Sequence, residues 1–303
     1  MPLVKILPDI KQVELDAAET LLQASLRLGI PHTHACGGNA RCSTCRCLIT
    51  EGLDNCAPRN ESERQMAERL NFTPEIRLAC QTRITGPVSM RRLALDAADV
   101  ELIKEDNAAP AASVGEEKRI AILFSDIRGF TTFSEGLPAY DVIHVLNRYF
   151  HEMGKVIQRN GGCIDNYIGD GIMALFGVQD PVDPARRAVT AGLEMLEALK
   201  QFSPYLMNLY GTSFRIGIGV HVGEAVVGSI GTGRSRRTTA IGDAVNFASR
   251  IESANKKANT SFLISEDTYK DVKDQVDVNA AVRLSIPGKT GEYNLYEVVR
   301  LKG

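Results

Sequence analysis

The chain has 303 residues, of which 44% are hydrophobic and 24% are charged, and its net charge at pH 7 is −2. This composition is typical of a globular protein that is long enough for two domains. The nearly balanced charge gives no reason to expect nucleic acid or an anionic membrane as a partner. No apolar run approaches the ~18 residues that cross a bilayer, and the first residues, MPLVKILPD, lack the apolar core of a signal peptide. We therefore expect a cytoplasmic protein.

The composition divides the chain into two parts and a connection. Six of the seven cysteines precede residue 81, and an odd number gathered at one end favours metal binding over a secreted disulfide framework. Residues 93–117 begin with a helical tendency and continue into an Ala/Pro/Ser stretch that is typical of a linker. We therefore expect domains at 1–92 and 118–303, joined by a linker or transducer at 93–117.

Four cysteines in the first part have the spacing of a metal centre: Cys36, Cys42, Cys45 and Cys80. The first three form C-x5-C-x2-C inside HACGGNARCSTC, and the fourth lies in RLACQT. Three thiolates on a short loop and one from a distant strand can hold a 2Fe-2S cluster, and Gly37 and Gly38 let the loop turn so that backbone N–H groups reach the sulfurs. A zinc ion held by four thiolates is the alternative, although zinc ligands usually come as two C-x2-C pairs.

We do not expect the remaining three cysteines or two nearby histidines to bind a metal. We expect Cys47, Cys56 and Cys163 to be ordinary thiols. His32 and His34 could suggest a Rieske centre, but four cysteines are already present. We therefore expect both histidines to be loop residues.

Residues 1–92 resemble the adrenodoxin-like 2Fe-2S ferredoxins. The resemblance rests on the five residues between the first two cysteines and on the surrounding sequence LLQASLRLGIPHTHACGGNARCSTCRC, and it implies a β-grasp fold. Freely diffusing carriers of that type are acidic, whereas residues 1–92 contain twelve Lys and Arg against ten Asp and Glu. Residues 1–92 therefore lack the negative charge that would attract such a carrier to a basic partner protein. Together with the fusion to a second domain, this favours a cluster that senses redox or iron status over one that shuttles electrons, and it leaves any redox partner unknown.

The second part alternates strands and helices. Five segments rich in Ile and Val and bounded by Gly or Asp predict strands: 119–126, 163–169, 172–177, 214–223 and 225–231. Apolar residues at helical spacing predict helices over 142–156 and 188–199. Strands and helices at this spacing indicate a layered domain of the α/β type.

Two aspartates stand at strand ends in this part. Asp126 ends the first strand, and Asp170 lies 44 residues later in the turn IGDG. Adjacent strand ends could bring the two carboxylates together as a site for a pair of Mg²⁺ or Mn²⁺ ions, and turn caps or solvated strand ends are the alternative. The segment SDIRGFTTFS can offer backbone N–H groups and a helix N-terminus to phosphates.

Asn246 and Arg250 lie four residues apart in TTAIGDAVNFASRIE and therefore on one face of a helix. An amide beside a planar guanidinium suits a sugar oxygen and a phosphoryl oxygen, and a surface capping pair is the alternative.

Over about residues 118–300 the chain resembles the catalytic domains of class III nucleotidyl cyclases. Four segments match the signatures of these domains in order: FSDIRGFTTFSE, GGCIDNYIGDGIMALFG, GDAVNFASRIE and IPGKTGEYNLYEV. The resemblance implies a ferredoxin-like βαββαβ fold, so that the whole chain is a two-domain α+β protein. It also implies that a nucleoside triphosphate is converted to its 3',5'-cyclic monophosphate and pyrophosphate. The implied metal ligands are Asp126, Asp170 and the Ile127 carbonyl.

The other roles that the resemblance implies concern the substrate. Gly129 and Phe130 fall in the segment that binds phosphates, Lys289 matches the lysine that binds the terminal phosphates, and Asn246 and Arg250 match the pair that orients the ribose and stabilises the transition state. In the family the aspartates come from one subunit, and the asparagine, arginine and lysine from its partner. The resemblance therefore implies a homodimer.

The base-reading positions fall at Asn166 and Thr239. In a regular strand Asn166 would point the same way as Ile164 and Ile168, and because a buried amide without a partner costs ~1–3 kcal/mol, we expect it to bind the purine or a nearby backbone group. Adenylyl cyclases have Lys at this position and guanylyl cyclases an acidic residue, while Thr at position 239, which we expect on the same strand face as Ile241, is common in bacterial adenylyl cyclases.

Both side chains can donate and accept, so we expect ATP as substrate and keep GTP open. A redox protein whose second domain only binds nucleotide is a further alternative. A diguanylate cyclase is not expected, because the GGDEF-type turn is absent.

Overall fold

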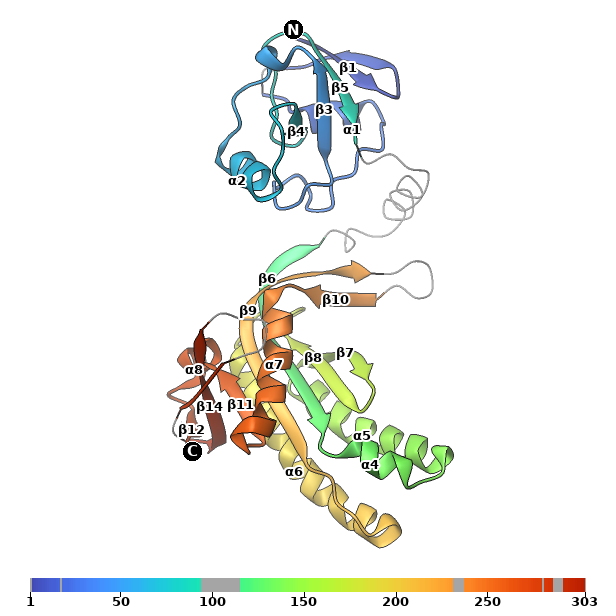
Figure 1. Ribbon diagram of the computed structural model, residues 1–303, viewed down its shortest axis with the longest axis vertical. Helices are drawn as coiled ribbons and strands as arrows, with labels where there is room; N and C mark the ends of the chain where they lie inside the picture. The colour runs from blue at the N-terminus through green and yellow to red at the C-terminus, as the bar shows by residue number, and fades with distance from the viewer. Residues whose placement is uncertain are drawn as a thin grey trace. The chain divides into compact units, whose positions relative to one another are not determined.

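The computed structural model describes residues 2–16, 18–93, 115–230, 237–279, 281–285 and 291–302 (Figure 1). Lys289 and residues 94–114 of the expected linker lie outside this part. The chain splits into two compact units, Met1–Glu116 with Gly228–Arg237, and Glu117–Val227 with Thr238–Gly303. Both combine sheets with helices, so the expected two-domain α+β class is confirmed.

The N-terminal unit is built on a five-stranded sheet with the order β2-β1-β5-β3-β4. Its strands are β1 Leu3–Leu7, β2 Lys11–Glu14, β3 Arg46–Glu51, β4 Ile76–Leu78 and β5 Val88–Arg92. The parallel pairing of β1 with β5 joins the two ends of the unit, while β3 pairs antiparallel with both β4 and β5. Its helices are α1 Leu21–Arg27, the 3-10 turn Leu53–Asn55 and α2 Glu61–Arg69.

Local sequence explains where these helices begin. Thr20 and Gln23 form a capping box at α1, and the Asn60 side chain accepts a hydrogen bond from the Glu63 N–H at the start of α2. Such caps satisfy N–H groups that have no partner within the helix.

The C-terminal unit contains a larger sheet with the order β12-β14-β11-β9-β6-β8-β7, to which β10 and β13 add by pairing with β9 and β14. The strands are β6 Glu116–Ile127, β7 Gly162–Ile168, β8 Gly171–Phe176, β9 Ile216–Ile230, β10 Arg237–Ile241, β11 Phe262–Ser265, β12 Val276–Val278, β13 Val282–Ser285 and β14 Glu292–Leu301. The helices are α4 Phe130–Glu135, α5 Ala139–Arg159, α6 Pro184–Tyr210, α7 Asp243–Ala258 and α8 Glu266–Val272. Among the described helices, none has the length and apolarity needed to cross a membrane.

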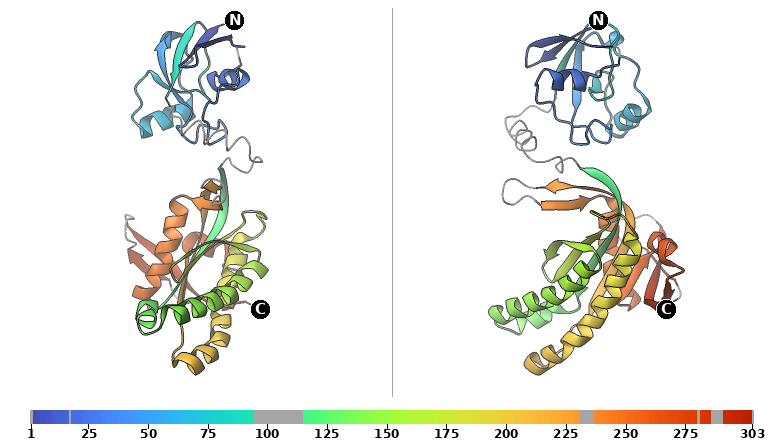
Figure 2. Two further views of the ribbon diagram at one scale, coloured as in Figure 1. Left: turned by 90° about the vertical axis from the view of Figure 1, so that its right-hand side faces the viewer. Right: turned by 180° about the vertical axis from the view of Figure 1, so that it is seen from behind.

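Helices cover both faces of this sheet. One core contains Ala121 and Leu123 of β6 with the buried residues of α5 and α6, which lie side by side (Figures 1 and 2). A second core, on the face covered by α7, contains Ile120 and Ile122 with Ala244. Because side chains alternate along a strand, this central strand is buried on both sides.

The expected helices are present and extend beyond the predicted ranges, as is normal for element ends. We expected two separate strands at 214–223 and 225–231. This prediction was wrong, because β9 is a single strand of 15 residues. Gly223 stands within it, where an added Cβ would lie 2.9 Å from the Ala244 side chain. This glycine marks a close approach of α7 to the sheet and not a strand end.

Candidate active site and cluster-binding loop

Asp126 and Asp170 come together at the end of β6. The Ile127 N–H donates a hydrogen bond to Asp170 Oδ2 at 3.2 Å. Gly171 makes the approach possible, because a Cβ at this position would lie 3.1 Å from the Ser125 carbonyl oxygen and 3.5 Å from Asp126 Oδ1. Partial burial and the neighbouring Asp126 carboxylate raise the pKa of Asp170.

The segment after Asp126 turns sharply into α4. Gly129, the residue before this helix, has φ 72°, a left-handed conformation that favours glycine. Phe130 begins the helix, and its ring packs against Phe133 and Phe214, which anchors the turn to the core. Gly129 is exposed, and the turn therefore presents its backbone beside the carboxylates.

Asn246 and Arg250 both lie on α7, as expected. Asn246 is exposed and Arg250 is half-buried, while Ala244, Phe247 and Ala248 bury the opposite side of the helix against the sheet. The helix pattern thus presents the amide and the guanidinium on the side of α7 that the sheet does not cover.

Asn166 does not share a face with Ile164, so this expectation was wrong. The register of β7 on β8 shifts between them, since Ile164 pairs with Ala174 and Asn166 pairs with the adjacent Met173. The bulge at Asp165 therefore moves Asn166 to the face of the sheet that carries Met173 and α7. Among the described residues, none forms a hydrogen bond with the Asn166 side chain.

Thr239 lies on β10 and is buried, with 6% of its surface exposed. Ile241, expected on the same face, is 57% exposed. Residue 239 is therefore largely covered, whereas the strand end at Ile241 is open.

In the N-terminal unit the four expected cysteines stand as two close pairs. The neighbouring Cys42 thiol lowers the pKa of Cys36 to about 5, and Cys36 in turn raises the pKa of Cys42. The neighbouring Cys45 thiol likewise lowers the pKa of Cys80 to about 7, while Cys80 and burial raise the pKa of Cys45. The pairs are neighbours, because the charges of Cys42 and Cys36 act on Cys45 and Cys80 respectively.

The pairing favours one of the two metal centres that four thiolates allow. A zinc site needs all four ligands around one ion, whereas a 2Fe-2S cluster takes two protein ligands on each of two irons. Two neighbouring pairs of thiols, in each of which one thiol has a lowered pKa and the other a raised pKa, therefore fit the cluster. Cys47 is buried, and burial raises the pKa of its thiol.

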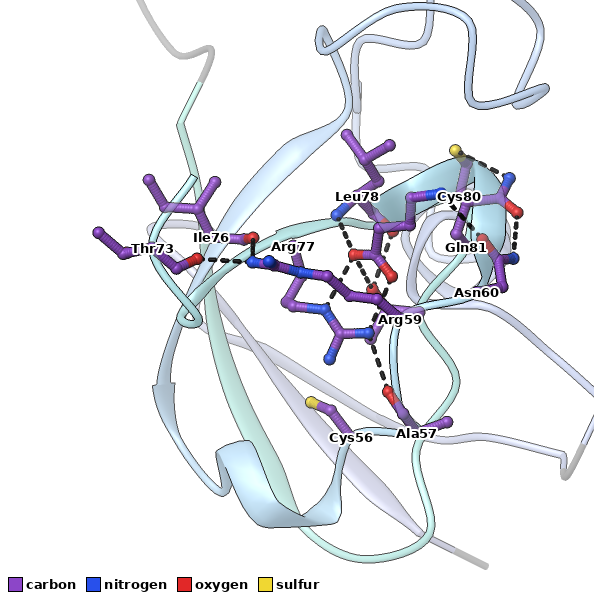
Figure 3. Close-up of polar contacts among 12 residues, drawn as sticks. Cys56, Ala57, Arg59, Asn60, Thr73, Ile76, Arg77, Leu78, Cys80 and Gln81 are labelled. Atoms are coloured by element: carbon purple, nitrogen blue, oxygen red, sulfur yellow. Dashed lines mark hydrogen bonds and ion pairs between the residues drawn. The ribbon is translucent and has the colours of Figure 1, made fainter. Parts of the chain in front are cut away.

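A side-chain amide reaches the fourth cysteine (Figure 3). Gln81 Nε2 lies 3.3 Å from Cys80 Sγ and 3.0 Å from the Gly38 carbonyl oxygen, and Asn60 Nδ2 donates to Gln81 Oε1 at 2.8 Å. The Asn60 contact orients the amide so that its N–H groups face the sulfur and the cluster loop. Hydrogen bonds to ligand sulfurs raise the reduction potential of such clusters.

His32 lies in a loop, as expected, but its side chain is buried, with 2% of its surface exposed. Its Nδ1 lies 3.0 Å from the Ser25 hydroxyl and its Nε2 lies 3.2 Å from the Cys45 carbonyl oxygen. The ring thus ties the cluster loop to α1. Nothing in the local sequence signals this, because the contacts join His32 to residues 7 and 13 positions away, beyond the reach of a helix or turn pattern.

Sequence reasoning also missed an ion pair between Arg128 and Glu252. Arg128 Nη2 lies 3.1 Å from Glu252 Oε1, and the side chains are only 15% and 8% exposed. Burial raises the pKa of Glu252, and the Arg128 charge opposes this rise. The alternation of glycine in FRIGIGVHVG, which leaves one face of a strand without side chains, could have indicated that something packs closely there.

Comparison with known proteins agrees with both halves of this description. Residues 113–299 match the adenylate and guanylate cyclase catalytic domain, and residues 4–85 match the 2Fe-2S iron-sulfur cluster binding domain. The chain therefore belongs to the adenylate and guanylate cyclase catalytic domain family. It carries a 2Fe-2S ferredoxin-type domain ahead of that catalytic domain.

Two adenylate cyclases are among the relatives that the chain matches. The chain is 36% identical over 190 residues to an adenylate cyclase of Anabaena cylindrica, covering 60% of this chain and 37% of the relative. It is 36% identical over 185 residues to "Adenylate cyclase, terminal-differentiation specific" of Dictyostelium discoideum, covering 60% of this chain and 9% of the relative. The chain thus spans well under half the length of these two relatives.

Solved structures agree with the fold of the C-terminal unit. The guanylyl cyclase Cya2 is 38% identical with a TM-score of 0.57, covering 62% of this chain and 95% of that one. The adenylyl cyclase CyaB from P. aeruginosa is 33% identical with a TM-score of 0.57, covering 61% and 96%.

Proposed function

We propose that the protein is an adenylyl cyclase that acts as a homodimer and converts ATP to 3',5'-cyclic AMP and pyrophosphate. The observation that carries the proposal is the contact of Asp126 and Asp170 at the end of β6, with the pKa of Asp170 raised. Two adjacent carboxylates repel each other when no cation lies between them. The pair is therefore suited to hard divalent ions that share phosphate oxygens.

Asp126, Asp170 and the Ile127 carbonyl would hold two Mg²⁺ or Mn²⁺ ions. These ions would supply Lewis-acid activation of the 3'-hydroxyl and neutralise the leaving pyrophosphate. Backbone N–H groups at Gly129 and Phe130 bind the triphosphate beside them.

The second half of the site comes from the other protomer. Asn246 of the partner subunit orients the ribose, and Lys289 of the partner subunit binds the terminal phosphates. A bond forms from the 3'-oxygen to the α-phosphorus while the bond from that phosphorus to its bridging oxygen breaks. Arg250 of the partner subunit stabilises the charge that grows in this transition state.

Asn166 and Thr239 read the purine in this proposal. ATP is supported by the adenylate cyclases among the relatives and by Thr at position 239. GTP is the second candidate, because Cya2, a guanylyl cyclase, is 38% identical over most of its own length. Product chromatography after anaerobic assay with each nucleotide decides between them.

The test of the shared site uses two inactive variants, Asp170→Asn and Arg250→Ala. Each should be inactive as a homodimer, because both of its sites carry the lesion. After mixing and subunit exchange, about half of the dimers are mixed, and each has one intact site of two, so activity should return to roughly a quarter of wild type. If tagged subunits show exchange and activity stays at background, the site is not shared between chains.

We further propose that a 2Fe-2S cluster in the ferredoxin domain, placed at residues 1–92, regulates the cyclase. The seven cysteines are all free thiols, which fits a reducing compartment such as the cytoplasm. The purified oxidised protein should be brown, and Cys80→Ser should lose most of the visible absorbance. Colourless protein that contains zinc and no iron would contradict the cluster.

A further inference from the structure

The ion pair between Arg128 and Glu252 joins two elements that the proposed function assigns to different tasks. Arg128 directly follows β6, two residues after Asp126, and Glu252 lies on α7, two residues after Arg250. Besides the ion pair of 3.1 Å, Arg128 Nη2 lies 3.4 Å from the Glu252 carbonyl oxygen. The Arg128 N–H donates to the Arg215 carbonyl at 2.7 Å, which fixes the backbone from which the side chain extends.

The strand between them is shaped to let this contact form. A Cβ at Gly217 of β9 would lie 1.7 Å from Arg128 Nη2 and 2.6 Å from Glu252 Oε1. A Cβ at Gly219 would lie 2.2 Å from the Glu252 backbone nitrogen. The residues between and beside them, Ile216 and Ile218, are buried in the opposite core. One face of β9 is therefore kept without side chains where the guanidinium and α7 cross it.

Stability alone does not account for such a pair. Removing two charges from water costs several kcal/mol, and well-packed apolar residues at the same positions would often stabilise a fold at least as well. What this buried ion pair, together with the hydrogen bond from Arg128 to the Glu252 backbone carbonyl, provides is a defined distance and direction between the groups that carry it. Here the groups belong to the loop beside the carboxylates and to the helix that carries Arg250.

We propose that Arg128 and Glu252 are positioning residues that couple the metal-binding end of β6 to α7, and thereby couple the two active sites of the dimer. This inference rests on the proposed function, in which Asp126 and Arg250 of one chain serve different sites. Each chain then contributes a metal-binding face to one site and an arginine face to the other, and the ion pair connects the two faces. A displacement at one site is passed to the other through this contact.

The complementing dimer of Asp170→Asn and Arg250→Ala subunits provides a directional test. Its single intact site combines the metal face of the Arg250→Ala chain with the arginine face of the Asp170→Asn chain. Glu252→Gln is then added to the Arg250→Ala chain, whose α7 no longer supplies an arginine to any site. The change can reach the intact site only through the metal-binding end of the same chain, by way of Arg128 or of the charge interaction between Glu252 and Asp126.

We expect kcat of the intact site to fall roughly 3- to 30-fold, with the KM for ATP changed less than about threefold and the apparent affinity for Mn²⁺ reduced. A role limited to supporting α7 would leave all three values unchanged in this arrangement. Adding Arg128→Gln to the same chain should restore part of kcat, because no unpaired buried charge remains. Lys257→Gln, an exposed charge loss at the end of α7, is the matched control.

The outcomes separate this inference from the proposed function. If the parent mixture of Asp170→Asn and Arg250→Ala stays inactive, the shared site is wrong, and the coupling that depends on it is wrong too. If the parent mixture recovers and Glu252→Gln leaves kcat within twofold of the Lys257→Gln control, the coupling alone is overturned. If the Glu252→Gln chain does not fold, Arg128→Lys is placed in the Arg250→Ala chain instead, since lysine keeps the charge but lacks the planar guanidinium. Its kcat is compared with the Lys257→Gln control in the same way.

Discussion

A single bulged residue decides what the side chain at position 166 can contact. Because Asp165 is extra in β7, Asn166 pairs with Met173 and lies on the sheet face that α7 covers. Its amide forms no hydrogen bond with the described residues, so it is available to a ligand. This supports the assignment of Asn166 to the purine in the proposed site.

Asn166→Lys should raise the preference for ATP over GTP. A lysine ammonium only donates hydrogen bonds, which suits adenine N1 and not the guanine N1–H. The ratio of kcat/KM for the two nucleotides should increase by about 10-fold or more. Ile143→Lys adds the same charge at an exposed position of α5 and serves as control. An unchanged ratio would mean that residue 166 does not contact the base.

His32 should make stability of the ferredoxin domain depend on pH. Burial, with the nearby Arg92 charge, lowers its pKa from 6.5 to about 4. The unfolded chain then binds more protons between these values, so the free energy of unfolding rises with pH in this window. The contribution is complete above pH ~6.5 and is lost as the pH falls toward 4, by about 3 kcal/mol in total.

His32→Gln, whose amide can still donate to the Cys45 carbonyl, should remove this part of the pH dependence. The measurement is the urea midpoint for loss of the cluster's visible absorbance, at about pH 7 and about pH 5, for both proteins. Equal differences between the two pH values would show that His32 is not the titrating group.

At the scale of elements, β9 determines how closely α7 packs on the sheet. Gly219→Ala should destabilise the catalytic domain by about 1–3 kcal/mol, because the new methyl group would overlap the Glu252 backbone. Thermal unfolding measures the effect. Gly136→Ala at the end of α4 is the control, since its Cβ would meet no atom closer than 3.7 Å. Equal melting temperatures would mean that α7 can move away from β9 without cost.

At the scale of the whole molecule, the proposed regulation predicts that turnover depends on the state of the cluster. Reduction changes the charge of a cluster with four thiolates from about −2 to about −3. One added charge can shift a balanced equilibrium enough for a change of about 5- to 150-fold in activity. The assay compares oxidised and dithionite-reduced protein under anaerobic conditions, with Cys80→Ser as a control that should show no difference. Equal turnover with an intact cluster would make the ferredoxin domain a structural or docking module.

The sequence by itself determined the domain types and most of the candidate site. Cysteine spacing, aspartates at strand ends and the asparagine–arginine pair on one helix face are local patterns, and a local pattern depends only on residues close together in the chain. For this reason Cys36, Cys42, Cys45 and Asp170 could be named before their surroundings were known. The layered class of the second domain followed from strand and helix periodicities in the same way.

Only the tertiary structure decided which distant groups meet. The bulge at Asp165, the two cysteine pairs and the burial of His32 depend on neighbours brought together by folding. Arg128 and Glu252 are 124 positions apart, and each alone is an ordinary charged residue of a loop or helix. Their pairing arises because β6 ends where α7 crosses the glycine face of β9, a coincidence of three elements that sequence periodicity does not encode.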